Sequence, residues 1–176
     1  MKKLDITKLV FFDASSVNLA YTRNYGRALK GKRIKQGIKD CRFQRQSILA
    51  TINTEKVMAD MVFEGTLNKE LFAYYLRFHL APILKKDEIL VMDNSSVHKS
   101  KLVMETIAEL GLNVLFLPPY SPDFNPIELL WSKIKSILKK LKARTYESLI
   151  NSVGFALSEI STSNLLNWFN HCCCCD

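Results

Sequence analysis

The chain has 176 residues, 48% of them hydrophobic and 24% charged, and its 25 lysines and arginines exceed its 17 acidic residues by eight. This length suits a domain with its own core, and the ordinary composition excludes a disordered chain. No apolar run reaches the roughly 20 residues of a spanning helix, and no signal-peptide cleavage site follows the start, so we expect a cytoplasmic protein with no membrane partner.

Three strands are predicted first along the chain. Residues 8–12, 46–54 and 56–64 have the short apolar or alternating patterns of strands. Residues 53–55 fit the turn of a hairpin between the second and third strands. Residues 23–42, between the first two strands, are basic and contain three glycines, so we expect a loop or an irregular hairpin there.

Helices and strands then alternate. Apolar residues at helical spacing predict helices over 68–84 and 98–110, and short apolar runs predict buried strands over 88–92 and 113–117. Gly111 stands where the second of these helices needs a C-cap. Three strands followed by alternating units predict an α/β fold, with a mixed five-stranded sheet covered by helices.

The most clearly delimited helix follows a proline-rich segment. Asn125 suits its N-cap and Pro126 its first position. From Ile127 onward, apolar residues recur at helical spacing, and Trp131 is one of them. We therefore interpret Trp131, like Trp168 further on, as a packing residue.

The last part of the chain is predicted to be a helical extension. Two helices are expected over 146–160 and 164–169, and the four adjacent cysteines at 172–175 are interpreted as a tail, because neighbouring cysteines do not easily converge on a zinc ion. The sequence thus divides into a domain over 1–142 and a C-terminal extension with a cysteine tail over 143–176.

The positive charge is concentrated in two segments. Nine basic residues and one acid lie between residues 23 and 45, and six basic residues with no acid lie between 133 and 144. Such segregated runs favour binding to a phosphate backbone, although a solvated basic surface is the alternative. The candidate DNA-binding residues are Arg23, Arg27, Lys30, Lys32, Arg33, Lys35, Lys133 and Lys135, with His98 as a further candidate that could instead form local hydrogen bonds.

Three acidic residues are candidates for chemistry. Asp13 and Asp93 each follow an apolar strand and precede small residues, and ligands of open α/β sheets bind beyond the carboxyl ends of strands. Aspartates also commonly end strands, and the spacing of Glu128 from Asn125 also fits a capping box. If the three acids do come together, their repulsion requires cations, and two Mg²⁺ or Mn²⁺ ions would suit phosphodiester displacement.

These segments resemble the catalytic domain of DDE transposases of the mariner superfamily, in its bacterial insertion-sequence branch, the insertion-sequence 630 group. The resemblance lies in FFDASS with RNYGRALKGKR behind it, in VMDNSSVHKS and in PPYSPDFNPIELLW, with 34 residues between Asp93 and Glu128. It implies a ribonuclease H-like fold. It also implies that Asp13, Asp93 and Glu128 are the catalytic triad that binds two Mg²⁺ or Mn²⁺ ions.

The resemblance further implies hydrolysis at transposon ends, followed by transesterification in which the freed 3′-hydroxyl attacks target DNA, usually at TA sites. The family works as a homodimer or larger assembly on DNA, which would place this protein at the nucleoid. Relatives carry a helix-turn-helix region before the catalytic domain, and only about eight residues precede the first strand here. We therefore expect that region to be absent through truncation or supplied by a separately encoded protein.

Two other functions remain open from the sequence. A decayed or repurposed copy would act only as a DNA-binding module. A ribonuclease H-like nuclease would cleave RNA–DNA hybrids or junctions, although the proline-rich motif argues against it.

Overall fold

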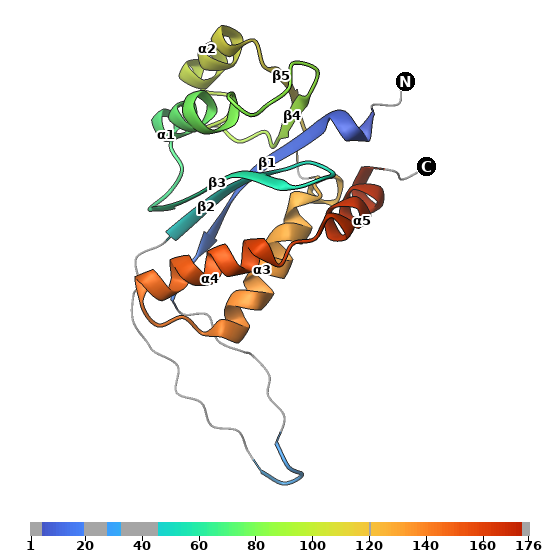
Figure 1. The fold of residues 1–176 in the computed structure, drawn as a ribbon. Helices are drawn as coiled ribbons and strands as arrows, with labels where there is room; N and C mark the ends of the chain where they lie inside the picture. The colour runs from blue at the N-terminus through green and yellow to red at the C-terminus, as the bar shows by residue number, and fades with distance from the viewer. Residues whose placement is uncertain (1–4, 20–27, 33–45, 120, 174–176) are drawn as a thin grey trace.

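The computed structural model describes residues 5–19, 28–32, 46–119 and 121–173. Its centre is a five-stranded sheet in the order β3-β2-β1-β4-β5 (Figure 1). The strands are β1 (Leu9–Val17), β2 (Gln46–Ile52), β3 (Val57–Glu64), β4 (Ile89–Met92) and β5 (Asn113–Phe116). β1, β2 and β3 are antiparallel neighbours, whereas β4 lies parallel to β1 and β5 parallel to β4. The predicted mixed sheet is confirmed.

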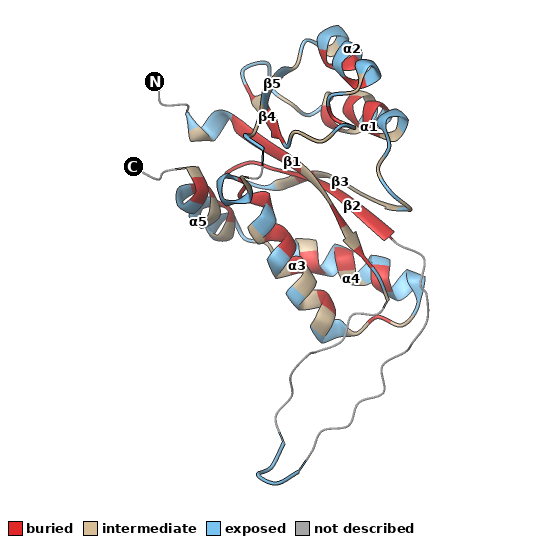
Figure 2. Ribbon diagram, turned by 180° about the vertical axis from the view of Figure 1, so that it is seen from behind, coloured by how far each residue is buried: buried red, intermediate tan, exposed pale blue. Residues whose placement is uncertain are grey.

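Helices cover both faces of this sheet (Figures 1 and 2). One face carries α1 (Lys69–Tyr75), which continues as a π-helical turn (Leu76–Leu80), and α2 (Lys101–Leu110). The other face carries α3 (Ile127–Leu141), α4 (Tyr146–Ser158) and α5 (Thr162–Cys173). None of the helices in the described ranges is long and apolar enough to cross a membrane.

The central strand β1 separates two cores. Val10 and Phe12 belong to the core beneath α1 and α2, whereas Leu9 and Phe11 belong to the core beneath α3, α4 and α5. The uninterrupted apolar run of this strand is typical of burial on both faces, because a strand covered on one face alternates apolar and polar residues.

β1 is longer than the sequence predicted. The strand was expected to end at Phe12, but its pairing with β2 continues as far as Val17 opposite Gln46. Asp13 therefore lies inside β1, opposite Ala50, and not after its end.

The C-terminal helices complete the core on the α3 side. The ring of Phe169 in α5 meets Phe11 of β1 edge-on, with 5.3 Å between the ring centroids. α5 also runs through Cys172, which is buried, and Cys173, which packs against the same core. Two of the four cysteines interpreted as a tail are thus helical and belong to the packed part of the protein.

β3 contains a β-bulge opposite the middle of β2. The register of the two strands shifts between Leu49 and Thr51, and Ala59 has a positive φ of 50°. The Tyr75 hydroxyl donates a hydrogen bond of 2.7 Å to the carbonyl oxygen of Ala59 and accepts one of 2.7 Å from the Thr51 hydroxyl. Tyr75 therefore holds the bulge in place from the helical layer.

Replacing Tyr75 by phenylalanine should lower the free energy of unfolding by about 1–3 kcal/mol, because the change leaves two polar groups next to a buried ring without their partner. Urea denaturation would measure the loss. Tyr74→Phe is the matched control, because Tyr74 is half exposed and removing its hydroxyl should change the free energy by less than about 0.5 kcal/mol. Equal effects of the two variants would contradict the role of Tyr75.

Candidate active site

Asp13 and Asp93 come together through the parallel pairing of β1 and β4. The register places Phe11 opposite Val91. Asp13 lies two residues after Phe11, and Asp93 lies two residues after Val91. β4 ends at Met92 whereas β1 continues, so Asp93 leaves the sheet beside Asp13. The longer β1 thus preserves the neighbourhood that the sequence predicted for the two aspartates, although Asp13 is not at a strand end.

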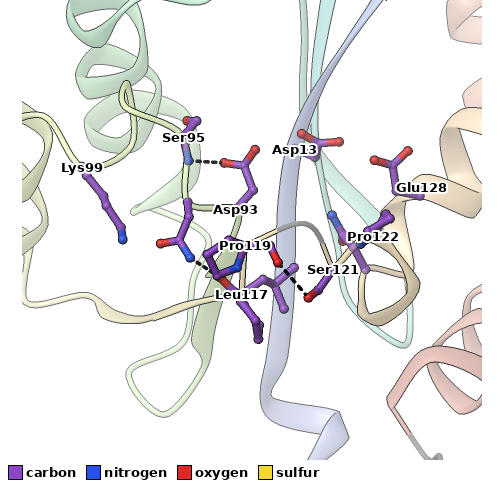
Figure 3. Close-up of a pocket in the computed structure, with 12 residues that line it drawn as sticks. Asp13, Asp93, Ser95, Lys99, Leu117, Pro119, Ser121, Pro122 and Glu128 are labelled. Atoms are coloured by element: carbon purple, nitrogen blue, oxygen red, sulfur yellow. Dashed lines mark hydrogen bonds between the residues drawn. The ribbon is translucent and has the colours of Figure 1, made fainter.

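The third carboxylate comes from the first turn of α3. Ile127 and Leu130 are fully buried beneath this helix, which fixes its start against the sheet, while Glu128 is exposed between them. Figure 3 shows the carboxylates of Asp93, Asp13 and Glu128 beside one another, from the end of β4, from β1 and from α3. The structure therefore brings together all three acids that the sequence singled out.

The capping-box interpretation of Glu128 is wrong. Pro126, one residue later than predicted, occupies the N-cap of α3, and no side chain caps the helix. The backbone N–H of Asn125 donates to the carbonyl oxygen of Pro122, and the Asn125 side-chain oxygen is buried without a partner among the described residues. The Glu128 carboxylate is thus not committed to the helix start.

The three carboxylates line one pocket of about 580 Å³ (Figure 3). Its walls come from the two sequence motifs that follow β4 and β5. The other lining residues are Asn94, Ser95, Lys99, Leu117, Pro118, Pro119, Ser121, Pro122 and Asn125. An Asn94 side-chain N–H donates to the carbonyl oxygen of Leu117, and this bond joins the two motifs across the pocket.

Asp13 is the carboxylate most affected by its surroundings. Burial raises its pKa to about 6, because desolvation disfavours the charged form. Hydrogen bonds from the Ala14 backbone and from the Trp131 indole, at 2.9 Å, lower the pKa, and the charges of Glu128 and Asp93 raise it. The neighbouring charges of Glu128 and Asp93 thus add to burial in disfavouring the ionised form of Asp13.

The raised pKa of Asp13 predicts how the stability of the metal-free protein depends on pH. Between about pH 4 and about pH 6 the folded state holds a proton that the unfolded state has lost, so stability falls as the pH rises through this window. Asp13→Asn removes the free-energy cost of ionising this buried side chain at higher pH. In EDTA at pH 8 this variant should melt about 2–4 °C higher than the wild type, the shift that about 1 kcal/mol produces in a chain of this size after allowance for solvent screening. At pH 4 the difference should vanish; a constant difference would contradict the raised pKa.

Asp93 is held by groups that follow β4. Its Oδ1 atom lies 2.6 Å from Nδ1 of His98 and accepts a 3.0 Å hydrogen bond from the backbone N–H of Ser95. These hydrogen bonds, that of His98 above all, keep the pKa of Asp93 below its usual value.

The predicted contact of His98 with DNA does not fit its position. The side chain is only 4% exposed, and its ring packs against Phe12 and Phe72. It lies in the turn before α2, which begins at Lys101 and not at residue 98. The local hydrogen bond, which the sequence left open as the alternative, is the observed interaction.

The two candidate lysines of α3 differ. The Lys133 ammonium donates to the carbonyl oxygen of Glu159 at 2.7 Å and to Oδ1 of Asn164 at 2.6 Å, so it ties α3 to the end of α4 and to the first turn of α5. These bonds compete with any contact between Lys133 and DNA. Lys135 is half-buried on the same helix.

Lys30 and Lys32 are both exposed. They lie in the segment 28–32, which stands away from the sheet in Figure 1, and neither lines the pocket. The remaining candidates lie outside the described residues: Arg23, Arg27, Arg33 and Lys35.

Sequence reasoning missed two residues of the site. Trp131, interpreted as a packing residue, donates a hydrogen bond to Asp13. The sequence feature that could have indicated this role is its spacing of three residues from Glu128, which places both side chains on one side of a helix. Lys99 lines the pocket, and its ammonium lies 5.1 Å from the centre of the Phe116 ring. Its position in the motif of Asp93 was the available signal.

The donor atoms of the pocket fit a hard divalent cation. Within the described ranges, no three ligating side chains converge tightly enough to enclose an ion by themselves. Besides the three carboxylates, the polar side chains of the lining include Asn94 and Asn125, whose Oδ1 atoms are buried and accept no hydrogen bond from described residues. An all-oxygen set of this kind suits Mg²⁺ or Mn²⁺ better than zinc or copper.

The strand order β3-β2-β1-β4-β5 with helices on both faces matches the ribonuclease H-like class of fold seen in solved transposase structures. A Mos1 transposase paired-end complex with the left transposon end superposes with a TM-score of 0.81 at 17% identity, covering 95% of this chain and 52% of that chain. The structure of the Mos1 transposase catalytic domain and raltegravir with Mg gives a TM-score of 0.72 at 16% identity and covers 96% of this chain and 79% of that chain. These likenesses establish the fold.

The family follows from the sequence match. The profile of the DDE superfamily endonucleases covers residues 8–150, and the chain belongs to this family. A human relative (Homo sapiens), histone-lysine N-methyltransferase SETMAR, is 36% identical over 76 residues, which are 43% of this chain and 10% of that protein. The chain thus spans about half of the Mos1 paired-end chain, at 52%, and matches a tenth of SETMAR.

Proposed function

We propose that the chain is the catalytic part of a DNA transposase, which cleaves transposon ends and joins the freed 3′-hydroxyl to target DNA. The observation that carries the proposal is the meeting of Asp13, Asp93 and Glu128 in one pocket of an endonuclease-family fold. Neighbours of similar fold include a Mos1 strand transfer complex. The motifs around these acids favour the bacterial insertion-sequence 630 group within the mariner superfamily.

The three carboxylates would hold two Mg²⁺ or Mn²⁺ ions, which supply activation of an attacking oxygen and stabilisation of a leaving oxygen in phosphodiester displacement. The chain itself contributes position. The sheet fixes the two aspartates, the buried start of α3 fixes Glu128, and Lys99 brings a positive charge to the pocket where a DNA phosphate would approach.

The proposed partners follow from the same function. The DNA substrates are transposon ends and a target that contains TA, and the basic residues of 23–35 would contact the backbone. We expect a homodimer or larger assembly on paired ends, located at the nucleoid. A helix-turn-helix region, in the same protein or in a separate one, would read the end sequence.

The test is cleavage and joining of DNA that carries the inverted repeats flanking the gene, with any helix-turn-helix protein encoded upstream also present. Nicked ends and insertions at TA are expected with Mg²⁺ or Mn²⁺ and none with EDTA. Salt-dependent binding without cleavage in either ion would favour a DNA-binding module. Cleavage confined to RNA–DNA hybrids would favour a ribonuclease H-like nuclease.

A further inference from the structure

Each aspartate of the pocket is bonded to a buried ring nitrogen, and the two rings belong to opposite cores of the protein. We propose that Trp131 and His98 are positioning residues that fix the carboxylates of Asp13 and Asp93 for metal binding. The inference rests on the proposed metal site, which assigns no role to either ring.

Trp131 reaches Asp13 from the core beneath α3. Its side chain is 2% exposed, and its Nε1 atom donates to Oδ2 of Asp13 at 2.9 Å. A tryptophan N–H is a donor only, so it pairs with one of the two carboxylate oxygens, Oδ2. The bond thereby fixes the rotation of a carboxylate that is partly buried in β1.

The same helix supplies both Trp131 and Glu128. The two residues are three positions apart, so their side chains are neighbours on the helix surface. The buried residues Ile127, Leu130 and Ile134 seat that surface against the sheet. The packing of α3 against the sheet therefore sets both the position of Glu128 and, through Trp131, the orientation of the Asp13 carboxylate.

His98 acts on Asp93 from the opposite side of the sheet. Its ring is enclosed by Phe12 and Phe72, with 5.5 and 4.6 Å between ring centroids, in the core beneath α1 and α2. An ionised carboxylate only accepts hydrogen bonds, so the Nδ1 atom at 2.6 Å carries a proton that it donates to Asp93. The Asp93 side chain is 53% exposed, and without this bond only the Ser95 backbone N–H, at 3.0 Å from Oδ1, would hold it.

Groups that orient metal ligands typically change metal affinity or activity by about 10–100-fold when they are mutated. Trp131→Phe keeps an aromatic ring in the core and removes the N–H, and Trp168→Phe is its matched control on the same core. His98→Phe removes the donor of the other ring, and His98→Asn restores an N–H near the Nδ1 position.

Binding of Mn²⁺, followed by electron paramagnetic resonance without DNA, is the first measurement. We expect Trp131→Phe and His98→Phe to weaken binding about 10–100-fold, with Trp168→Phe and His98→Asn within about threefold of the wild type. Weakening by Trp168→Phe equal to that by Trp131→Phe would show that only packing matters and would overturn the role of Trp131. Binding in His98→Asn as weak as in His98→Phe would overturn the role of His98.

The second measurement uses tryptophan fluorescence. The chain has two tryptophans, so the Trp168→Phe protein reports on Trp131 alone. Mg²⁺ should change its emission, because the indole shares the Asp13 carboxylate with the ion, and Asp13→Asn should abolish the change. Mn²⁺ binding with unchanged Trp131 emission would overturn this contact. Absence of metal binding in the wild-type protein would instead contradict the proposed metal site itself.

Discussion

Replacement of Asp93 by asparagine should reduce metal-dependent DNA cleavage by more than about 100-fold. Loss of a metal ligand should have a larger effect than loss of a residue that only orients a ligand, which typically costs about 10–100-fold. The change keeps the size of the side chain and removes one of the three negative charges that face the pocket. Because the Asp93 side chain is 53% exposed, its replacement should change the stability of the fold little. Cleavage rates at saturating Mg²⁺ or Mn²⁺ would measure the effect.

Asp123→Asn is the matched control for this prediction. Asp123 is an exposed acid in the same proline-rich segment as the pocket, but it does not line the pocket. Its replacement makes the same change of charge and should leave cleavage within about twofold of the wild type. DNA binding should persist in both variants. An Asp93→Asn protein that cleaves as fast as the control would contradict the role of Asp93.

The second large effect concerns DNA affinity. Joint replacement of Lys30, Lys32 and Arg33 by alanine should weaken binding and lower the slope of log affinity against log salt by about 1 for each DNA phosphate that these side chains neutralise. The two lysines are exposed. Binding measured by fluorescence anisotropy at several salt concentrations gives both quantities.

A triple replacement elsewhere separates local contacts from overall charge. Lys56, Lys69 and Lys86 are exposed lysines outside both basic runs, and their change to alanine removes the same three charges. This variant should keep the salt slope of the wild type to within about 0.5. An equal decrease of the slope in the two triple variants would show that the basic segment is only a solvated surface.

The parts of the site that depend on local pattern could be predicted. The apolar runs before Asp13 and Asp93 indicated neighbouring buried strands, and the proline-rich segment before Glu128 indicated a fixed helix start. The position of Asp13 within its strand depended on the pairing of β1 with β2. Asp13 lies within β1 because β2 extends beside it, and no residue near Asp13 in the sequence specifies the length of that partner.

The roles of the two rings depended on contacts across the fold. The hydrogen bond between Trp131 and Asp13 spans 118 residues. The spacing of Trp131 from Glu128 places the two side chains on one side of α3, but it does not identify Asp13 as the partner of the indole. His98 has a polar ring, which suggested a phosphate contact, but Phe12 and Phe72 enclose it from distant segments. Lys133 similarly meets residues of the C-terminal helices. Such pairings follow from the tertiary fold and not from spacing.

The β-bulge at Ala59 also bears on self-association. β3 forms one edge of the sheet, and an edge strand exposes amides and carbonyls to which another chain can add a strand. The shift in register at the bulge twists this edge out of regular geometry, and β5 at the opposite edge is only four residues long. Both edges thus discourage a continuous intermolecular sheet. We therefore expect copies that assemble on DNA to meet through helices and loops, and concentrated protein to resist aggregation by strand addition.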